Sequence, residues 1–168
     1  LDSKTDLEKP PELIDLGVTF ILGADYLKKL TGAEVIVRSP GIPRDLPEII
    51  EAEAKGAKVT SQTQLFFDWC PAEIIGVTGT KGKGTTASLI YEMLRKQGTD
   101  AYLGGNIGKP PFTFLDQLSA QSKVGLELSS FQLEDIKSSP HIGVLLMTRS
   151  EHLDKDIVVT QNYLKSFA

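Results

Sequence analysis

Short apolar runs alternate with amphipathic segments along most of this chain, and turn residues separate them. The apolar runs predict strands at residues 18–22, 33–38, 58–60, 74–78, 100–103, 123–128 and 141–147. The amphipathic segments predict helices at residues 8–16, 24–30, 46–55, 62–69, 87–97 and 162–168. This alternation over short loops favours an α/β fold with a parallel sheet. We expect a domain boundary near Cys70-Pro71, which gives two domains, residues 1–70 and 71–168.

The most informative stretch runs from Ile74 to Thr86, where a short apolar strand leads through a glycine-rich turn into a helix. A turn of this kind can direct several backbone N–H groups at one point, and a phosphate group fits there. Glycines let the backbone approach the anion closely. Lys83 can supply a positive charge for the terminal phosphates, and Thr85 or Thr86 can offer a hydroxyl to Mg²⁺.

The same stretch departs from the usual P-loop pattern, G-x-x-x-x-G-K-[ST]. That pattern would place a glycine at Val77 and a serine or threonine at Gly84. Here the upstream glycine is Gly76, one residue early, and the hydroxyl comes one residue late. We favour a phosphate site, and the alternative is a strand-to-helix turn without a ligand.

Polar residues follow four consecutive predicted strands. The first group is the glycine-rich turn, and the others are Gly105-Asn106, residues 127–132 and Glu151-His152. Ligands of open parallel sheets bind at the carboxyl ends of the strands. We therefore expect the four groups to converge on one crevice.

Glu127 is an acidic residue inside an otherwise apolar strand. A buried carboxylate needs a cation or hydrogen-bond donors, and Mg²⁺ is the natural cation beside a triphosphate. A glutamate on the solvent side of an alternating strand is the alternative. His152 alone is more typical of a surface or capping histidine than of a ligand. Asn106 and Gln132 are neutral donors that could orient a substrate, although asparagine after two glycines is also an ordinary turn residue.

Composition limits the classes of binding partner and the cellular compartment that we expect for this protein. The 168 residues carry a net charge of −4, which argues against non-specific binding of nucleic acid. No apolar run approaches the roughly 18–20 residues that a membrane-spanning helix needs, so we expect no membrane segment. Cys70 is the only cysteine, so it cannot form an internal disulfide, and we expect a reducing, cytoplasmic location.

The glycine-rich stretch resembles the nucleotide loop of the Mur ligases and the folylpolyglutamate synthases; its residues are Gly79, Thr80, Lys81, Gly82, Lys83, Gly84, Thr85 and Thr86. Residues 104–108, 126–133 and 151–154 are similar to motifs of the Mur ligases, and most to the branch that uses D-glutamate. The resemblance implies a partial Rossmann-like, UDP-sugar-binding domain in residues 1–70. It implies a partial P-loop-containing, ATP-binding central domain in residues 71–168.

This resemblance also implies an activity, an ATP-dependent ligase of peptidoglycan precursor synthesis. ATP would phosphorylate the free carboxylate of UDP-N-acetylmuramoyl-L-alanine, and the amine of D-glutamate would attack the acyl phosphate to form an amide. Such phosphoryl transfer depends on positioning and charge neutralisation.

Individual roles follow from the same resemblance. Lys83 would hold the β- and γ-phosphates, Thr85 or Thr86 would contact a first Mg²⁺, and Glu127 and His152 would hold a second. The residues that would hold the UDP-muramoyl substrate are Asp2, Ser3, Ser39, Pro40, Gly41, Asn106, Ser129 and Gln132.

Some features of the family are missing from the sequence. The opening strand and glycine loop of the first domain, part of the central domain and the whole third domain have no counterpart, so we expect a fragment of a longer ligase that is inactive alone. Phe167 stands where the family has a metal-bridging lysine. We expect a monomer. The alternatives are a folylpolyglutamate synthase-like ligase, which Gly84 suggests, and a nucleotide-binding module without catalysis.

Overall fold

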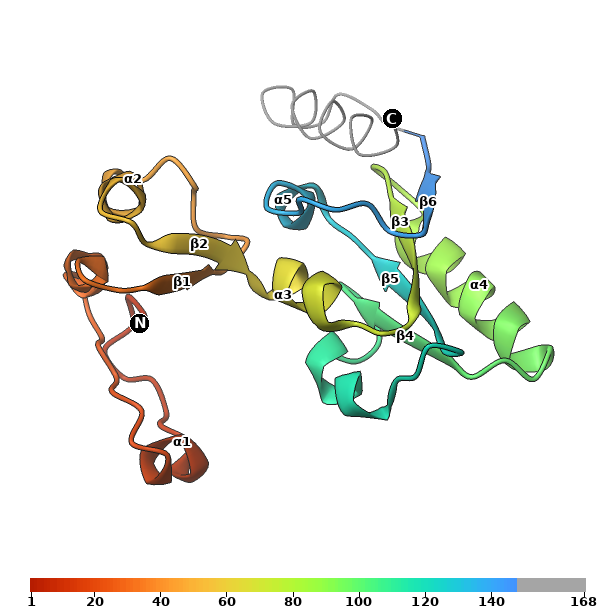
Figure 1. The fold of residues 1–168 in the computed structure, drawn as a ribbon, viewed down its shortest axis with the longest axis horizontal. Helices are drawn as coiled ribbons and strands as arrows, with labels where there is room; N and C mark the ends of the chain where they lie inside the picture. Colours follow the sequence, from red (N-terminus) through yellow and green to blue (C-terminus); the bar gives the residue numbers. More distant parts are fainter. Residues whose placement is uncertain (148–168) are drawn as a thin grey trace. The chain divides into compact units, whose positions relative to one another are not determined.

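The computed structural model describes residues 1–147 and divides the chain into two compact units (Figure 1). The first unit comprises Leu1–Arg38 and Ile42–Thr60, and the second comprises Ser39–Gly41 and the chain from Ser61 onward. Each unit has its own cluster of buried apolar side chains. Each therefore has its own source of hydrophobic stabilisation.

The first unit contains a two-stranded sheet of β1 and β2. Its elements are α1 (Pro11–Asp15), η1 (Tyr26–Leu30), β1 (Val35–Arg38), α2 (Pro47–Ala54) and β2 (Lys58–Ser61). Its core consists of Leu30, Ile36, Ile49, Ala52 and Val59. Along β1 exposed and buried residues alternate, and α2 buries two residues three positions apart, so the periodicities that predicted both elements are confirmed. The helix predicted at residues 24–30 is the short 3₁₀ helix η1.

The strand predicted at residues 18–22 is wrong. Only an isolated parallel bridge forms there, between Asp2 and Leu22. The amide of Asp2 donates to the carbonyl of Ile21 at 3.1 Å, and the amide of Gly23 donates to the carbonyl of Asp2 at 3.0 Å. Gly23 then turns the chain with a φ of +94°. The apolar run finds a pairing partner over one residue only, which is too little for a strand.

The second unit is built on a four-stranded parallel sheet with the order β4-β5-β3-β6. The strands are β3 (Glu73–Thr78), β4 (Ala101–Gly105), β5 (Lys123–Glu127) and β6 (Ile142–Leu145). The helices are α3 (Gln62–Trp69), α4 (Lys83–Lys96), η2 (Pro111–Thr113), η3 (Leu115–Gln117) and α5 (Ser130–Leu133). The predicted α/β fold with a parallel sheet is confirmed, and the carboxyl ends of the four strands lie along one edge.

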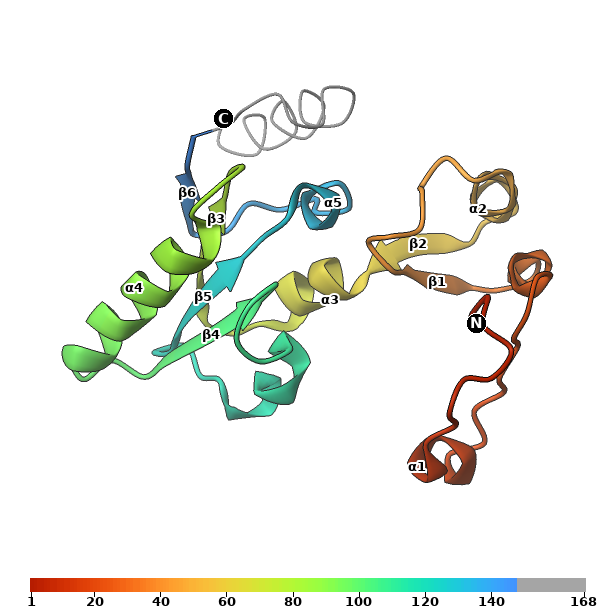
Figure 2. The ribbon, with the colours of Figure 1, turned by 180° about the vertical axis from the view of Figure 1, so that it is seen from behind.

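The two faces of this sheet bury different side chains. On one face, the buried residues include Val124, Leu126 and Leu128 from β5 and its end, Phe66 from α3 and Leu133 from α5. On the other face lies α4, and Figures 1 and 2 show α3 and α4 on opposite sides of the sheet. A Cβ on Gly125 would lie 3.7 Å from the carbonyl oxygen of Ala87 in α4, so glycine leaves room for the helix. Glu127, two residues later, is on the α4 face as well.

The compact units divide before α3, whereas the sequence placed the boundary after it, at Cys70-Pro71. The reason is long-range packing of the helix. The rings of Phe66 and Phe114 meet edge to face with centroids 6.0 Å apart. The side-chain oxygen of Gln64 accepts a hydrogen bond of 2.6 Å from the amide of Lys137. These contacts attach α3 to the second unit.

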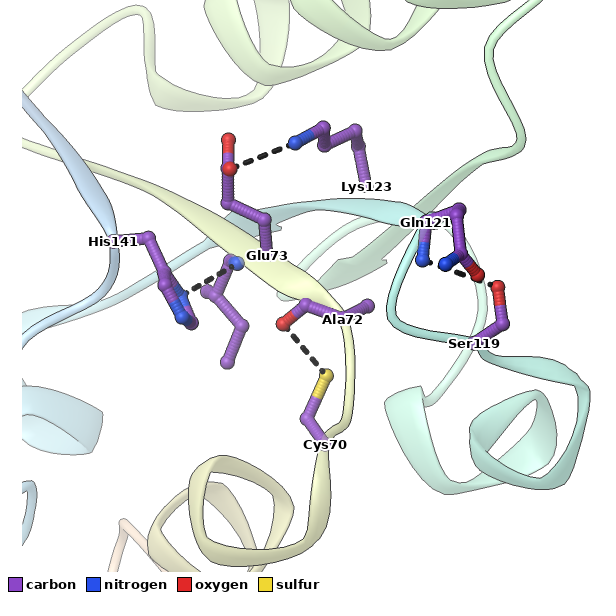
Figure 3. Close-up of polar contacts among 8 residues, drawn as sticks. Cys70, Ala72, Glu73, Ser119, Gln121, Lys123 and His141 are labelled. Carbon is purple, nitrogen blue, oxygen red and sulfur yellow. Dashed lines mark hydrogen bonds and ion pairs between the residues drawn. The ribbon is translucent and has the colours of Figure 1, made fainter.

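Polar contacts stabilise the amino-terminal edge of the sheet (Figure 3). Lys123 and Glu73, at the starts of β5 and β3, form an ion pair of 2.7 Å. The amide of Ile74 donates to Nδ1 of His141 at 3.0 Å, so this histidine joins the start of β3 to the segment before β6. This edge lies opposite the one at which the predicted site residues gather.

Candidate functional site

The predicted strand, turn and helix at residues 74–97 are present as β3, a glycine loop (residues 79–82) and α4. Gly79 and Gly82 have φ values of +134° and +85°, a region that residues with a side chain rarely adopt. A Cβ on Gly79 would lie 2.8 Å from Cβ of Leu146. The loop therefore needs glycine at residue 79 for two reasons, backbone conformation and space.

The amino terminus of α4 lies at the end of this loop. Its N-cap residue is Gly82, and no side chain caps the helix. The first intrahelical contact is the 2.9 Å hydrogen bond from the amide of Thr86 to the carbonyl of Gly82. The preceding amides have no partner within the helix, and such groups together with the helix dipole attract anions.

Lys83 lies over the loop at the first position of α4. Its Nζ donates to the carbonyl of Gly79 at 2.9 Å and to the carbonyl of Thr80 at 3.2 Å. The side chain is half-buried, so its charge is held at the loop rather than extended into water. This arrangement places one ammonium group next to the uncapped helix terminus.

Glu127, the last residue of β5, is 8% exposed. Within residues 1–147 no donor forms a hydrogen bond with its carboxylate. A Cβ built on Gly84 of α4 would lie 3.0 Å from Oε2 of Glu127, so the carboxylate borders the first turn of the helix. The solvent-facing alternative is therefore wrong, because the side chain is buried beside the glycine loop.

The turn after β4 lies against the end of β5. The amide of Asn106 donates to the carbonyl of Glu127 at 3.1 Å. Gly105 has a φ of +97°, and a Cβ there would overlap the backbone of Glu127. The side chain of Asn106 is exposed. Two of the predicted polar groups are thus brought together with the glycine loop at one edge of the sheet.

Ser129 and Gln132 form the capping box of α5. The side chain of Ser129 accepts from the amide of Gln132 at 3.3 Å, and Oε1 of Gln132 accepts from the amide of Ser129 at 2.9 Å. The spacing Ser-x-x-Gln is a signal for a helix start that could have been used to predict α5. This pairing uses Oε1 of Gln132 and leaves its amide nitrogen as the group that could meet a ligand.

Comparison with known proteins identifies the family of this chain. Residues 77–168 match the model of the Mur ligase middle domain. The chain belongs to the Mur ligase family.

Three similar curated relatives share the name UDP-N-acetylmuramoylalanine--D-glutamate ligase. The relative from Ruminiclostridium cellulolyticum is 47% identical over 143 residues, which are 85% of this chain and 31% of that protein. The relative from Acetivibrio thermocellus is 45% identical over 139 residues, 83% of this chain and 30% of that protein. The relative from Clostridium botulinum (strain Hall) is 43% identical over 143 residues, with shares of 85% and 31%. The chain spans about a third of the length of these relatives.

A solved Mur ligase has the same fold. It is UDP-N-acetylmuramate:L-alanyl-gamma-D-glutamyl-meso-diaminopimelate ligase from Neisseria meningitides, with a TM-score of 0.55 and 22% identity. The alignment covers 98% of this chain and 59% of the other. At this identity the likeness supports the α/β fold alone.

Several predicted site residues of this Mur ligase chain do not belong to the group around the glycine loop, or lie outside the residues that the structure describes. His152, like the predicted helix at 162–168 and Phe167, is outside residues 1–147. Asp2 and Ser3 lie in the first unit, at the bridge to Leu22. Ser39–Gly41 groups with the second unit although the residues on both sides of it belong to the first.

The candidate metal ligands within the described residues suit a cation that binds together with a nucleotide, rather than one held by protein side chains alone. Nowhere in residues 1–147 do three histidine, cysteine, aspartate or glutamate side chains gather as a metal site. Mg²⁺ usually keeps several waters and binds one or two carboxylates together with substrate phosphates. The carboxylate of Glu127 beside the glycine loop fits this second kind of site. Thr85 is exposed and Thr86 is half-buried.

Some residues around the site were not predicted from the sequence. Ile107 borders Gly84, and Leu146 packs against the glycine loop. Both are ordinary apolar residues with no chemical signal. A separate pocket of about 410 Å³ opens along β4 and is lined by Tyr91, Arg95, Tyr102 and Lys109 among others, but by no predicted site residue.

In the described part of the chain, no helix has the length and apolarity needed to cross a bilayer.

Proposed function

We propose that this chain is part of an ATP-dependent ligase that joins D-glutamate to UDP-N-acetylmuramoyl-L-alanine. The observation that carries the proposal is the 47% identity, over 85% of the chain, to a relative named for that reaction. The site geometry supports it independently, because a glycine loop, a lysine and a buried carboxylate meet at the carboxyl edge of a parallel sheet. An enzyme that uses these substrates belongs in the cytoplasm, and we propose that it works as a monomer.

Residues 79–86 would bind the phosphates of ATP. The amide of Thr80 donates to the carbonyl of Met147 at 3.1 Å, so the donors for phosphate oxygens would come from the other loop amides and the uncapped start of α4. Lys83 would exchange its hydrogen bonds to the loop carbonyls for contacts with the β- and γ-phosphates. The ammonium group is already at the loop, so this exchange needs a change of partner and no long movement.

Thr85 or Thr86 would contact a first Mg²⁺, and Glu127 would hold a second together with His152. The cation supplies charge neutralisation for phosphoryl transfer when it is bound. Glu127 suits this role because it is buried without a donor in the described part of the chain. A carboxylate in that position is costly until a cation compensates its charge.

The remaining predicted residues would hold the UDP-muramoyl substrate. Asn106 follows β4 beside Glu127, and its exposed amide can meet a substrate that reaches the loop. Ser129 and Gln132 are held in place by their capping box, which orients them for a polar ligand. Asp2, Ser3 and Ser39–Gly41 would contact the UDP-sugar, with residues 1–70 as the sugar-binding part and residues 71–168 as the ATP-binding part.

The reaction would proceed by transfer of the γ-phosphoryl group from ATP to the substrate carboxylate. The amine of D-glutamate would then attack the acyl phosphate, and the tetrahedral intermediate would release phosphate and leave the amide. Lys83 would hold the transferring phosphates in line.

Phosphate release tests this proposal. The full-length natural protein is mixed with ATP, Mg²⁺, UDP-N-acetylmuramoyl-L-alanine and D-glutamate, and one component is left out at a time. Phosphate that appears only in the complete mixture supports the ligase and its amino acid together. Phosphate that instead requires a folate and L-glutamate would favour the folylpolyglutamate synthase-like alternative. If the protein bound ATP but released no phosphate, the result would favour the alternative of a nucleotide-binding module without catalysis.

A further inference from the structure

The residue directly after Lys83 is glycine, where the P-loop pattern has serine or threonine. The structure shows what this position faces. A Cβ on Gly84 would lie 3.0 Å from Oε2 of Glu127 and 3.2 Å from Cγ2 of Ile107. A side chain at residue 84 would therefore point at the carboxylate. The 3.0 Å contact is tighter than an ordinary contact of a Cβ, so the side chain of Glu127 would move by a few tenths of an ångström, and a hydroxyl at residue 84 would then be within reach of it.

Thr85 does not occupy the same place. Successive residues of an α-helix leave it about 100° apart around the axis. The side chain of Thr85 accordingly lies on a different side of α4, and it is exposed. The hydroxyl that comes one residue late in the sequence is thus not directed at Glu127 from the position of Gly84.

The chemistry of a hydroxyl makes this difference matter. A hydroxyl has one proton to donate and two lone pairs. When a lone pair binds a cation, the proton needs an acceptor, and Oε2 of Glu127 is the acceptor beside residue 84. A serine at this position could serve the cation and Glu127 together, whereas glycine serves neither.

We propose that Gly84 weakens the binding of divalent cation at the nucleotide loop, and that Glu127 is the residue through which a serine at this position would strengthen it. The inference rests on the proposed function, because it requires a nucleotide at the loop. Gly84 would thus set the Mg²⁺ concentration that is needed to occupy the cation site at the nucleotide loop.

The test measures metal binding directly. Mn²⁺ is titrated into the full-length natural protein at saturating ATP, and free Mn²⁺ is followed by electron paramagnetic resonance. The variants are Gly84→Ser, Gly84→Ala and the double variant Gly84→Ser with Glu127→Gln. Gly84→Ala is the matched control, because it adds the Cβ without the hydroxyl. ATP binding in EDTA is measured for each protein.

One hydrogen bond to a charged group predicts that Gly84→Ser lowers the half-saturating Mn²⁺ concentration by about tenfold. Gly84→Ala should not lower it, and the gain should disappear when Glu127 is replaced by glutamine. Equal values for Gly84→Ser and Gly84→Ala would overturn the inference. Loss of ATP binding in EDTA by Gly84→Ser alone would also overturn it, since the glycine would then serve the loop itself. If the unsubstituted protein bound no ATP at all, the proposed function would fall as well.

Discussion

The backbone of Gly105 lies directly against the backbone of Glu127, and no side chain fits between them. Gly98 offers a matched comparison, because its φ is also positive, at +78°, but nothing lies within 4 Å of a Cβ placed there. Gly98→Ala should lower the free energy of unfolding by about 1 kcal/mol, the cost of a left-handed residue with a side chain. Gly105→Ala should cost about 3 kcal/mol or more, because overpacking is added.

Urea denaturation of the two variants measures this difference. Equal midpoints for Gly98→Ala and Gly105→Ala would show that the turn after β4 can move away from Glu127. The contact between the end of β4 and the end of β5 would then not be a fixed part of the site.

Glu127→Gln should have opposite effects on stability and on activity. The glutamine is neutral and similar in shape, so the cost of burying a charge without a donor is relieved, and the free energy of unfolding should rise by about 1 kcal/mol. Magnesium-dependent turnover should fall by about 10–100-fold, the usual effect of weakening a metal site. Thermal unfolding and phosphate release, measured on the same preparation, check both parts.

Glu92→Gln is the control for this variant, since Glu92 is an exposed residue of α4. It should change neither stability nor turnover. A destabilised Glu127→Gln protein would mean that the carboxylate stabilises the fold in the absence of a cation, against the role assigned to it.

Lys83→Ala should abolish most turnover, because its ammonium group is held at the loop by hydrogen bonds to the carbonyls of Gly79 and Thr80. Removal of a charged group that stabilises a transferring phosphoryl typically lowers kcat by about 10²–10³-fold. Lys96→Ala, at the exposed last turn of α4, is the control with the same charge change. Rates within a factor of about two of the unsubstituted protein in Lys83→Ala would contradict the assignment.

Cys70 should react slowly with alkylating reagents in the folded protein. Burial raises the pKa of its thiol above the ordinary value, because the thiolate loses solvation there. Less thiolate is therefore present near pH 8 than in an unfolded chain, and the thiolate is the reactive form. Peptide mass spectrometry of iodoacetamide-treated protein, with and without urea, measures the protection of this residue.

The sign of the pH effect on stability follows from the same shift. The pKa of the Cys70 thiol is higher in the folded than in the unfolded protein. Its contribution to the free energy of unfolding is therefore fully present below the unfolded pKa and is lost as the pH rises through the folded pKa. Cys70→Ala should remove the part of the loss of stability at alkaline pH that is due to this thiol. Rapid alkylation of Cys70 in the folded protein at pH 8 would contradict the prediction.

Local signals predicted those parts of the fold that local interactions determine. The helix α3 begins after Ser61, whose side chain accepts from the amide of Gln64 at 3.1 Å, and its predicted bounds match the structure. The strand, loop and helix around Lys83 were likewise predictable, because glycines mark the turn and periodicity marks the elements beside it.

Long-range packing determines what the sequence did not predict. The attachment of α3 to the second unit depends on Phe66 meeting Phe114, and no local pattern specifies this pair. The side of the sheet to which Glu127 points was also open, since alternation along β5 allows both. The position of α4 decides it, and that position is a property of the folded unit.

The alternation of side chains along β5 has a consequence for how mutations can affect this protein. Leu126 and Leu128 enter the core, and Glu127 between them enters the site, so the three side chains are set by a single register. A slip of one residue would bury the charge among phenylalanines and place leucine beside the glycine loop. A one-residue slip in this strand would therefore remove the carboxylate from the loop and disrupt the core at the same time.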